Sequence, residues 1–315
     1  MDVLVLSEAE VRQLLDPDAL LDALATEFVA LTRGETVAPA RNEVSVPDAG
    51  FLLGMPAWRP GQPIGVKLVS VFHENYRLGL PGHLALMCLF DPATGAPVAV
   101  MDGTAITAIR TAAAAALSVR LLARPDARVL AILGAGVQGR EHLAFVPRVR
   151  EVTDIRVASL YAEDAERLAA QDPRARMVPE FEVAVRDADV VCLCTTAAEP
   201  VVQPDWLSEG VHLTSVGYMP PGGELHPDLV RRGHLFVEAR LAFEPTPVGC
   251  AELEDVEPAL GTELGEVLLG QKPGRRDARE LTVYKAMGHA AEDLAAAALV
   301  LRRAQQVGAG QTISF

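Results

Sequence analysis

The feature that most constrains the fold is a glycine-rich turn between an apolar strand and a helix. Residues 129–133 form a short apolar run typical of a buried parallel strand, and a G-x-G-x-x-G motif follows directly as Gly134-Ala-Gly136-Val-Gln-Gly139. The first glycine permits the tight turn, the second lets the backbone approach a pyrophosphate, and the third lets the helix pack on the strand. The free N–H groups that open the helix can then bind the phosphates. In this context the motif predicts a dinucleotide site.

Short strands and helices alternate around this turn. The pattern predicts strands at residues 129–133, 155–159, 175–178, 190–194, 211–216 and 235–237, with helices between the earlier ones. Alternating elements of this kind indicate a doubly wound parallel sheet, and hence an α/β Rossmann domain.

The chain before residue 102 follows a different pattern. Ser7 and Glu10 fit a capping box, and Asp16-Pro17 begins a second helix that runs to about Thr32. Short strands without intervening helices are then expected at residues 43–46, 51–55, 65–72, 83–90 and 96–101, which predicts an antiparallel sheet. An alanine-rich helix is expected at 104–123 and a long helix at 282–304.

These patterns predict two domains in the 315 residues. We expect a dinucleotide-binding Rossmann domain at residues 113–289. It is inserted into a split α+β domain that residues 1–112 form together with residues 290–315.

Composition limits the classes of partner. The formal net charge of −14 argues against a nucleic-acid or anionic-membrane surface, and it requires that any anionic ligand meet local positive charges. There is no apolar run of about 18 residues and no basic start leading into an apolar segment, so we expect a cytoplasmic protein. The four cysteines and seven histidines lack metal-site spacing, so no metal is expected.

The choice between NAD and NADP stays open. An acid at the end of the second Rossmann strand selects NAD, whereas a nearby arginine accepts the extra phosphate of NADP. Ser159 stands at that place and no arginine follows immediately. The residues expected to contact the dinucleotide are Gly134, Gly136, Val137, Gln138, Gly139, Ser159, Thr195, Thr196, Val216, Gly217 and Met287.

Three further segments carry motifs. They are Met101-Asp-Gly-Thr-Ala-Ile-Thr-Ala-Ile-Arg-Thr-Ala-Ala113; Gly50-Phe-Leu-Leu-Gly-Met-Pro-Ala57 before Gly65-Val-Lys67; and Gly261-Thr-Glu-Leu-Gly-Glu-Val-Leu-Leu-Gly270 before Leu281-Thr-Val-Tyr-Lys-Ala-Met-Gly288. Together with the glycine-rich turn they resemble the ornithine cyclodeaminase/μ-crystallin family over nearly the whole chain. The resemblance implies hydride exchange between a nicotinamide and the α-carbon of an amino or imino acid. It also implies that the split domain binds substrate and forms a homodimer through its sheet.

The resemblance places three cations on the family's substrate-carboxylate positions: Arg41, Lys67 and Arg110. An acidic protein that binds a carboxylate needs such a local cluster, since arginine offers a bidentate fork and lysine a compact charge that can also donate a proton. Lys67 is therefore expected to be catalytic as well as substrate-binding. His73 and His83 are further candidates for the lining of the substrate pocket, with a solvated role as the alternative.

Several positions depart from the family pattern. They are Met219 where cyclodeaminases have a catalytic aspartate, Leu53-Gly54 for a glutamate, Gly222-Gly223 for a lysine, Gly82 for a threonine and Ala286 for a serine. Cyclodeamination needs an acid/base to activate the side-chain amine, which methionine cannot supply. Tyr218 and Met219 are still expected to face the pocket, whereas Glu224 is expected to have a structural role at the start of a helix.

We therefore expect an NAD(P)H-dependent reductase of a cyclic ketimine or α-imino acid, or an enzyme that runs the reverse oxidation. Simple hydride transfer needs only a bound nicotinamide, a carboxylate-binding site and one proton donor. Two alternatives remain open at this stage: a cyclodeaminase that acts on ornithine or a related diamino acid, and a crystallin-like protein that binds the dinucleotide without turnover.

Overall fold

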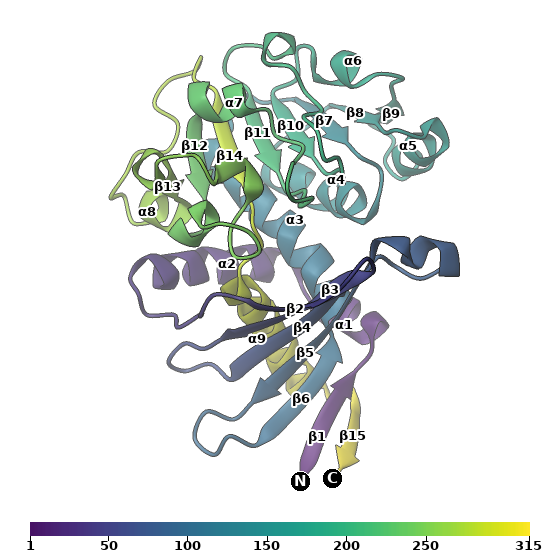
Figure 1. Cartoon of the computed structure of the whole chain (residues 1–315), viewed down its shortest axis with the longest axis vertical. Helices are drawn as coiled ribbons and strands as arrows, with labels where there is room; N and C mark the ends of the chain where they lie inside the picture. The colour runs from purple at the N-terminus through teal and green to yellow at the C-terminus, as the bar shows by residue number, and fades with distance from the viewer. The chain divides into compact units, whose positions relative to one another are not determined.

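The computed structural model describes residues 1–315, apart from the side chains of His73 and Tyr76. The chain divides into two compact units (Figure 1). Unit 1 comprises Met1–Arg110 and His289–Phe315, and unit 2 comprises Thr111–Gly288. The expected α/β fold class is confirmed, because unit 2 has a parallel Rossmann-type sheet and unit 1 has a mixed sheet with helices.

Unit 2 is built on eight strands. They are β7 (Val129–Leu133), β8 (Asp154–Ala158), β9 (Ala175–Met177), β10 (Val190–Leu193), β11 (His212–Ser215), β12 (His234–Val237), β13 (Thr262–Glu263) and β14 (Thr282–Lys285). The sheet order is β13-β12-β14-β11-β10-β7-β8-β9, and each recorded pairing is parallel. The order reverses between β7 and β10, which is the switch point where sheets of this kind bind ligands.

Both faces of this sheet are buried. The helices of unit 2 are the second half of α3 (Gly103–Leu122), α4 (Val137–Val149), α5 (Ala162–Ala169), α6 (Phe181–Val185), α7 (Pro227–Arg232) and α8 (Leu264–Leu268). Leu130 and Ile132 of β7 belong to one core cluster, whereas Ala131 and Leu133 belong to another. Successive side chains of a strand point to opposite faces, so burial on both faces explains why β7 is a continuous apolar run.

The composition of the alanine-rich helix α3 is compatible with either a membrane span or a buried core helix. The helix is long and apolar enough to cross a membrane, but 83% of its apolar window is buried inside the protein. Core helices of globular proteins share this composition, and the small alanine side chains allow neighbouring elements to pack closely on α3.

The expectation of one long helix at residues 282–304 is wrong. Thr282–Lys285 is a buried strand, β14, and the helix α9 begins only at Ala290 and ends at Val307. Gly288, whose φ is +75°, separates the two elements, and His289 caps the helix by accepting a hydrogen bond from the N–H of Ala291. The β-branched and aromatic side chains of Thr282, Val283 and Tyr284 favour the strand.

Unit 1 is built on a seven-stranded sheet. Its strands are β1 (Asp2–Leu6), β2 (Asn42–Val46), β3 (Gly50–Ala57), β4 (Ile64–Val71), β5 (His83–Phe90), β6 (Pro97–Asp102) and β15 (Gln311–Ser314), in the order β15-β1-β6-β5-β4-β3-β2. The helices are α1 (Glu8–Leu14), α2 (Pro17–Thr32), the first half of α3, and α9 (Ala290–Val307), and η1 (His73–Leu78) precedes β5.

The five strands expected between residues 43 and 101 are antiparallel neighbours, as predicted, but two further strands make the sheet mixed. The strands β2 to β6 are antiparallel neighbours, but β1 pairs parallel to β6 and antiparallel to β15. Sequence patterns missed β1 and β15 because each has only five or four residues, and because every residue of β15 is exposed and so shows no alternation.

One face of the unit-1 sheet is covered by α9, which packs on β3, β4 and β5. This face buries Leu53, Met55, Val69, Met87 and Leu89, each at most 4% exposed. Burial of such side chains stabilises the unit by about 1.5–3 kcal/mol each. Lys67 lies on the same buried face, since it pairs directly with Met55 and Met87.

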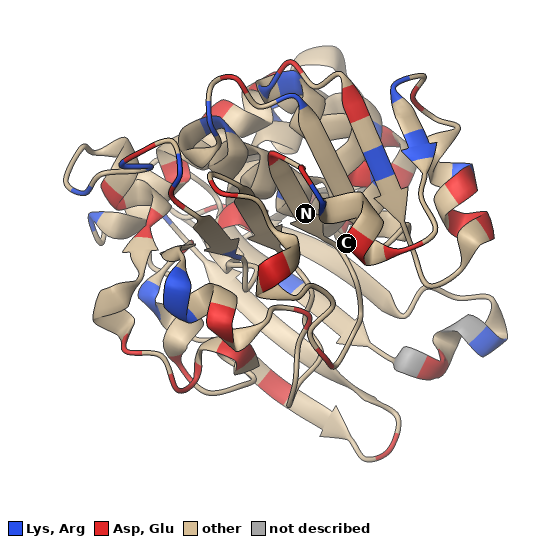
Figure 2. Ribbon diagram, turned by 90° about the horizontal axis from the view of Figure 1, so that it is seen from above, with Lys and Arg blue, Asp and Glu red and all other residues tan. Residues whose placement is uncertain are grey.

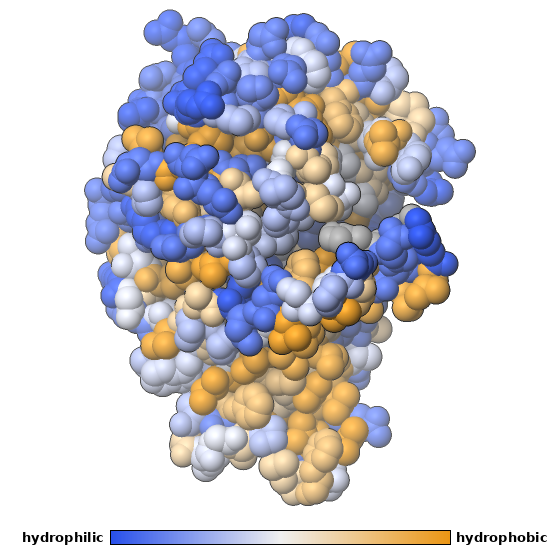
Figure 3. All heavy atoms as spheres, viewed as in Figure 1, coloured by the Kyte–Doolittle hydropathy of each residue, from blue (hydrophilic) through white to orange (hydrophobic). Residues whose placement is uncertain are grey.

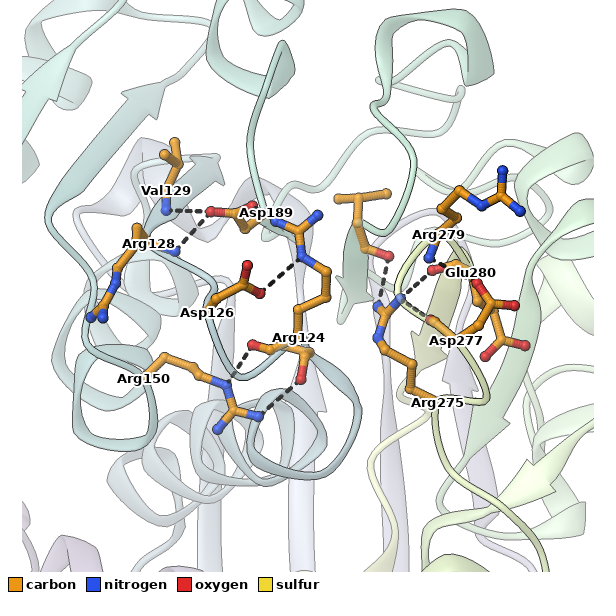
Figure 4. Close-up of polar contacts among 12 residues, drawn as sticks. Arg124, Asp126, Arg128, Val129, Arg150, Asp189, Arg275, Asp277, Arg279 and Glu280 are labelled. Atoms are coloured by element: carbon orange, nitrogen blue, oxygen red, sulfur yellow. Dashed lines mark hydrogen bonds and ion pairs between the residues drawn. The ribbon is translucent and has the colours of Figure 1, made fainter.

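Arginine side chains satisfy carbonyl groups at the C-terminal end of α3 and in the two residues that follow it; Figure 4 shows Arg150 directed at Arg124. Arg150 donates to the carbonyl oxygens of Arg120 (2.9 Å), Ala123 (3.0 Å) and Arg124 (3.2 Å), and Arg275 donates to that of Leu122 (2.6 Å). The last carbonyls of a helix have no partner within the helix, so these charged donors both satisfy them and complement the helix dipole.

We expect Arg150→Met to lower the free energy of unfolding by about 2 kcal/mol, because it leaves several partly buried carbonyls without a donor. Urea unfolding followed by circular dichroism measures the change. Arg167→Met is the matched control, since Arg167 makes only an exposed pair with Asp164 one turn away. Equal stability of the two variants would contradict the assigned role of Arg150.

Candidate active site

The glycine-rich turn of unit 2 connects β7 to α4. Gly134 has a φ of +99°, and a Cβ there would lie 2.5 Å from the carbonyl oxygen of Cys194. At Gly139 a Cβ would lie 2.0 Å from the carbonyl oxygen of Gly134, so only glycine allows α4 to begin so close to the strand. A Cβ at Gly136 would meet nothing within 4 Å. The backbone of Gly136 therefore borders open space.

This open space fits a pyrophosphate. The N-cap residue of α4 is Gly136, which has no side chain to bond the first N–H groups of this thirteen-residue helix. Val137 and Gln138 are its first two residues, and Val137 is 48% exposed. Unpartnered N–H groups and the positive end of the helix dipole bind phosphate oxygens. The residues present thus fit a dinucleotide.

The second strand of the fold ends in small and exposed residues. The strand β8 ends at Ala158 and Ser159 follows, half-buried, ahead of Leu160 and Tyr161, which are exposed. Arg167, one to two turns into α5, pairs with Asp164. The end of β8 therefore has neither an acid, which would select NAD, nor an adjacent arginine, which would select NADP. These residues do not decide between the two cofactors.

The other residues expected to contact the dinucleotide lie at the carboxyl ends of neighbouring strands. Thr195 and Thr196 follow β10, Val216 and Gly217 follow β11, and Met287 follows β14. The structure thus brings them to one edge of the unit-2 sheet, since parallel strands end at the same edge. Tyr218 and Met219 continue the chain from Gly217, and Met219 forms an isolated bridge with Gly222.

Glu224 does not lie at the helix start where it was expected. It does not begin a helix, since α7 starts at Pro227 with His226 as its N-cap. Its buried carboxylate instead accepts hydrogen bonds from the N–H of Thr195 (2.7 Å) and the N–H of Gly217 (2.6 Å). Glu224 therefore ties together two of the loops at the cofactor edge.

In unit 1, Lys67 and Arg110 meet two acids from α9. The Lys67 Nζ lies 2.7 Å from Asp293 Oδ2, and the Arg110 Nε donates to Asp293 Oδ1 at 2.9 Å. The Arg110 Nη1 donates to Glu292 Oε2 at 3.1 Å. All four side chains are at most 4% exposed. The name cationic cluster is used below for these four residues and Arg41. The charge of Arg41 also lowers the pKa of Lys67.

Burial and neighbouring charges set the protonation of this cluster. Burial lowers the pKa of Lys67 to about 8, opposed by Asp293 and assisted by Arg110 and Arg41. Burial alone would raise the pKa of Asp293, but Lys67 and Arg110 outweigh it and hold that pKa below its ordinary value. Lys67 is thus an amine that exchanges its proton near neutral pH, as a general acid must.

His83 lies beside the cluster. Burial and the charges of Lys67 and Arg110 lower the pKa of His83 to about 4, so it is neutral at pH 7. The side chain of the other candidate histidine, His73, lies outside the part of the chain that the structure describes. Arg41 is half-buried and directly precedes β2.

Sequence reasoning missed the acids that hold the cations. Glu292 and Asp293 are the one charged pair in the apolar stretch from Ala290 to Leu301, and this isolation was a signal of burial. Their partners are more than 180 residues away in the chain, so no local spacing could identify them. Within the described part of the chain, no group of three or more His, Cys, Asp or Glu could hold a metal ion.

The chain is similar to known proteins over most of its length. A model of the ornithine cyclodeaminase/mu-crystallin family matches residues 1–308. The ketimine reductase mu-crystallin of Mus musculus is 36% identical over 303 residues, which cover 94% of this chain and 95% of that protein.

Two solved structures extend the likeness. The Δ(1)-pyrroline-2-carboxylate reductase of Thermococcus litoralis, in complex with NADH and L-proline, has a TM-score of 0.93 and 32% identity, and the match covers 99% of this chain and 100% of that one. An archaeal alanine dehydrogenase dimer with bound NAD has a TM-score of 0.89 and 30% identity, with complete coverage of both chains. By these matches the chain belongs to the ornithine cyclodeaminase/mu-crystallin family, whose members include NAD(P)-dependent oxidoreductases.

Proposed function

We propose that this chain is an NAD(P)H-dependent reductase of a cyclic ketimine or α-imino acid, which also runs the reverse oxidation of the amino acid. The observation that carries the proposal is the buried Lys67, an amine that pairs with Asp293 and whose pKa of about 8 is lowered by burial and by the charges of Arg110 and Arg41. Similar proteins include a ketimine reductase and a pyrroline-2-carboxylate reductase, which supports this class of substrate.

Each residue has a role in the proposal. Arg110 and Arg41 bind the substrate carboxylate, because guanidinium forks match the two carboxylate oxygens. Lys67 donates the proton that the substrate nitrogen gains on reduction, either directly or through water. Gly134, Gly136 and Gly139 shape the turn that binds the pyrophosphate, and a bound nicotinamide would supply the hydride.

The alternative of ornithine cyclodeamination has less support. That reaction needs an acid/base near the reacting amine, and Met219 supplies neither a proton nor an acceptor at the place of the expected aspartate. Hydride transfer to a preformed imine needs no such group.

The proposal is tested by following nicotinamide absorbance with NADH and NADPH in turn. The substrates are the five- and six-membered cyclic ketimine carboxylates, and pyruvate with methylamine. We expect turnover of at least one imine, and we expect Lys67→Met to lower kcat on the order of 100-fold or more while NADH still binds, since Lys67 is in unit 1. The cofactor that supports turnover also decides between NAD and NADP.

Two outcomes would reject the proposal. One is release of ammonia from ornithine without net NADH formation, which identifies a cyclodeaminase. The other is tight cofactor binding without turnover of any imine, which identifies a binding protein. Full activity of Lys67→Met would remove Lys67 from the mechanism.

The protonation of Lys67 gives a pH profile. Because a pKa of about 8 leaves Lys67 charged below that pH, reductive kcat/KM should be constant below pH 8 and fall as the pH rises through it. Burial, Arg110 and Arg41 lower the pKa of Lys67, whereas Asp293 raises it. The other titratable groups near Lys67 are Glu292, which pairs with Arg110, and His83, which is neutral. Asp293→Asn should therefore move the decline to lower pH.

The pH dependence of initial rates measures this shift. A decline caused by titration of the substrate itself would stay at the same pH in Asp293→Asn. A profile identical to that of the native chain would therefore contradict proton donation by Lys67.

We also propose that the chain forms a homodimer through the open face of the unit-1 sheet. Leu52, Leu68 and Leu86 lie on this face, opposite α9, and are 41%, 40% and 53% exposed. Figure 3 shows a broad hydrophobic surface over β3 to β6, and in Figure 2 these strands are largely free of charge. Large apolar patches of this kind mark interfaces. The occupant we assign is a second copy, because the similar alanine dehydrogenase is a dimer.

We expect Leu86→Glu to convert the dimer to a monomer, because it places a charge on the apolar face, directly beside Leu68. Size-exclusion chromatography with light scattering should give the 33.5 kDa chain mass for the variant and twice that for the native protein. The matched control is Val307→Glu, which changes an equally exposed residue at the end of α9. A native monomer, or a Leu86→Glu dimer, would refute the proposed interface.

A further inference from the structure

Three buried charges in unit 2 have no part in the reaction described above. They are Glu224, Glu252 and Lys285, which we call the charge network. Lys285 ends β14, and Glu252 lies in the short 3₁₀ segment Ala251–Leu253. The network lies at the carboxyl ends of β10, β11 and β14, at the same edge of the sheet as the glycine-rich turn.

The Glu224 carboxyl group accepts hydrogen bonds from four donors. Besides the N–H groups of Thr195 and Gly217, the hydroxyls of Thr195 (2.6 Å) and Ser215 (3.0 Å) donate to it. A protonated carboxyl has fewer acceptor sites and adds a donor of its own, so this arrangement matches the carboxylate.

Lys285 is held as a cation. Its Nζ lies 2.8 Å from Glu252 Oε1, 2.7 Å from the carbonyl oxygen of Gly217 and 3.2 Å from the hydroxyl of Ser215. Burial alone would lower the pKa of Lys285, but Glu252 outweighs it, with help from Glu224, and the pKa is raised. The charge network therefore contains two carboxylates and one ammonium, which leaves a net negative charge.

The charge network holds Gly217 from both sides. The N–H of Gly217 donates to Glu224, and its carbonyl oxygen accepts from Lys285. Glycine is required at this place, since a Cβ would lie 2.6 Å from the Glu224 side chain and 2.7 Å from the carbonyl oxygen of Thr195. Glycine is likewise required at residue 223, because a Cβ there would lie 2.0 Å from the Glu252 carboxylate.

A fourth buried charge adds to the negative field. Glu238 accepts hydrogen bonds from the N–H groups of Met287 (3.0 Å) and Gly288 (3.1 Å), in the loop that follows β14. Thr195, Gly217 and Met287 are all residues expected to contact the dinucleotide. Each of these loops is thus held by a buried carboxylate.

We propose that the charge network positions Gly217 and Thr195 for the nicotinamide ring and makes this chain bind the oxidised dinucleotide more tightly than the reduced one. The oxidised ring carries a positive charge that the reduced ring lacks, and a buried net negative charge stabilises a nearby cation. The inference rests on the proposed dinucleotide cofactor. It deepens that proposal, because tighter binding of the oxidised form makes the bound reduced form a stronger hydride donor to an imine.

Opposite charge changes within the network test this inference. Dissociation constants for NAD⁺ and NADH, or for the NADP pair if that binds better, are measured by isothermal titration calorimetry. We expect Glu252→Gln and Glu224→Gln to raise the ratio of the oxidised to the reduced dissociation constant by roughly fivefold. We expect Lys285→Met to lower the same ratio by a similar factor, because it removes the one positive charge.

Because the ratio is expected to change in opposite directions in the two kinds of variant, the experiment distinguishes an effect of charge from structural damage. A variant that only distorts the loops weakens both cofactor forms and leaves the ratio unchanged, so an unchanged ratio in Glu252→Gln and Lys285→Met would overturn the inference. The matched control is Glu280→Gln, which removes a buried carboxylate just before β14, at the opposite end of that strand, and should leave the ratio unchanged.

The wild-type protein separates this inference from the proposed function. If it binds neither form of either dinucleotide, the proposed cofactor is wrong and the inference is rejected with it. If it binds both forms and the variants do not move the ratio in opposite directions, only the inference is rejected.

Discussion

The ion pairs of Lys67 and Arg110 with Asp293 and Glu292 are the interaction on which unit 1 depends. Each charge alone would cost several kcal/mol to bury, and their mutual attraction offsets that only when the geometry is good. The pairs also connect β4 and α3 to α9, which comes from the far end of the chain. Since loss of one partner leaves an uncompensated buried charge, the same contacts that bind the unit together keep both cations in fixed positions.

The architecture of unit 2 was predictable because its determinants are local. The strand β7, the glycine-rich turn and the start of α4 are contiguous, and each glycine answers a steric requirement within a few residues or on a neighbouring strand. The error at β14 has an equally local cause. Thr282–Lys285 precedes an alanine-rich helix, and the helix pattern was extended across Gly288, although a glycine with positive φ ends such a pattern.

The site was predictable only in part. Glycines and threonines at strand ends were proposed from the motif and the strand pattern, and the three cations from the family resemblance, but the anions near them were not proposed. Asp293, Glu224 and Glu252 act on partners that the fold, and not the sequence spacing, brings near. Glu224 shows the limit well, since its position just before a helix suggested a terminal role, whereas its side chain turns back to the ends of β10 and β11.

The two groups of buried charge have opposite signs, and each sign suits its proposed ligand. In the cationic cluster, Lys67, Arg110 and Arg41 face two acids, and His83 is neutral, so one positive charge remains. That excess complements a single carboxylate in a protein whose net charge is −14. In the charge network two carboxylates face one ammonium, and the excess is negative. An acidic protein that simply avoided buried charge would have neither group. In this chain one group has an excess of positive charge and the other an excess of negative charge, as recognition of an anionic substrate and a cationic ring requires.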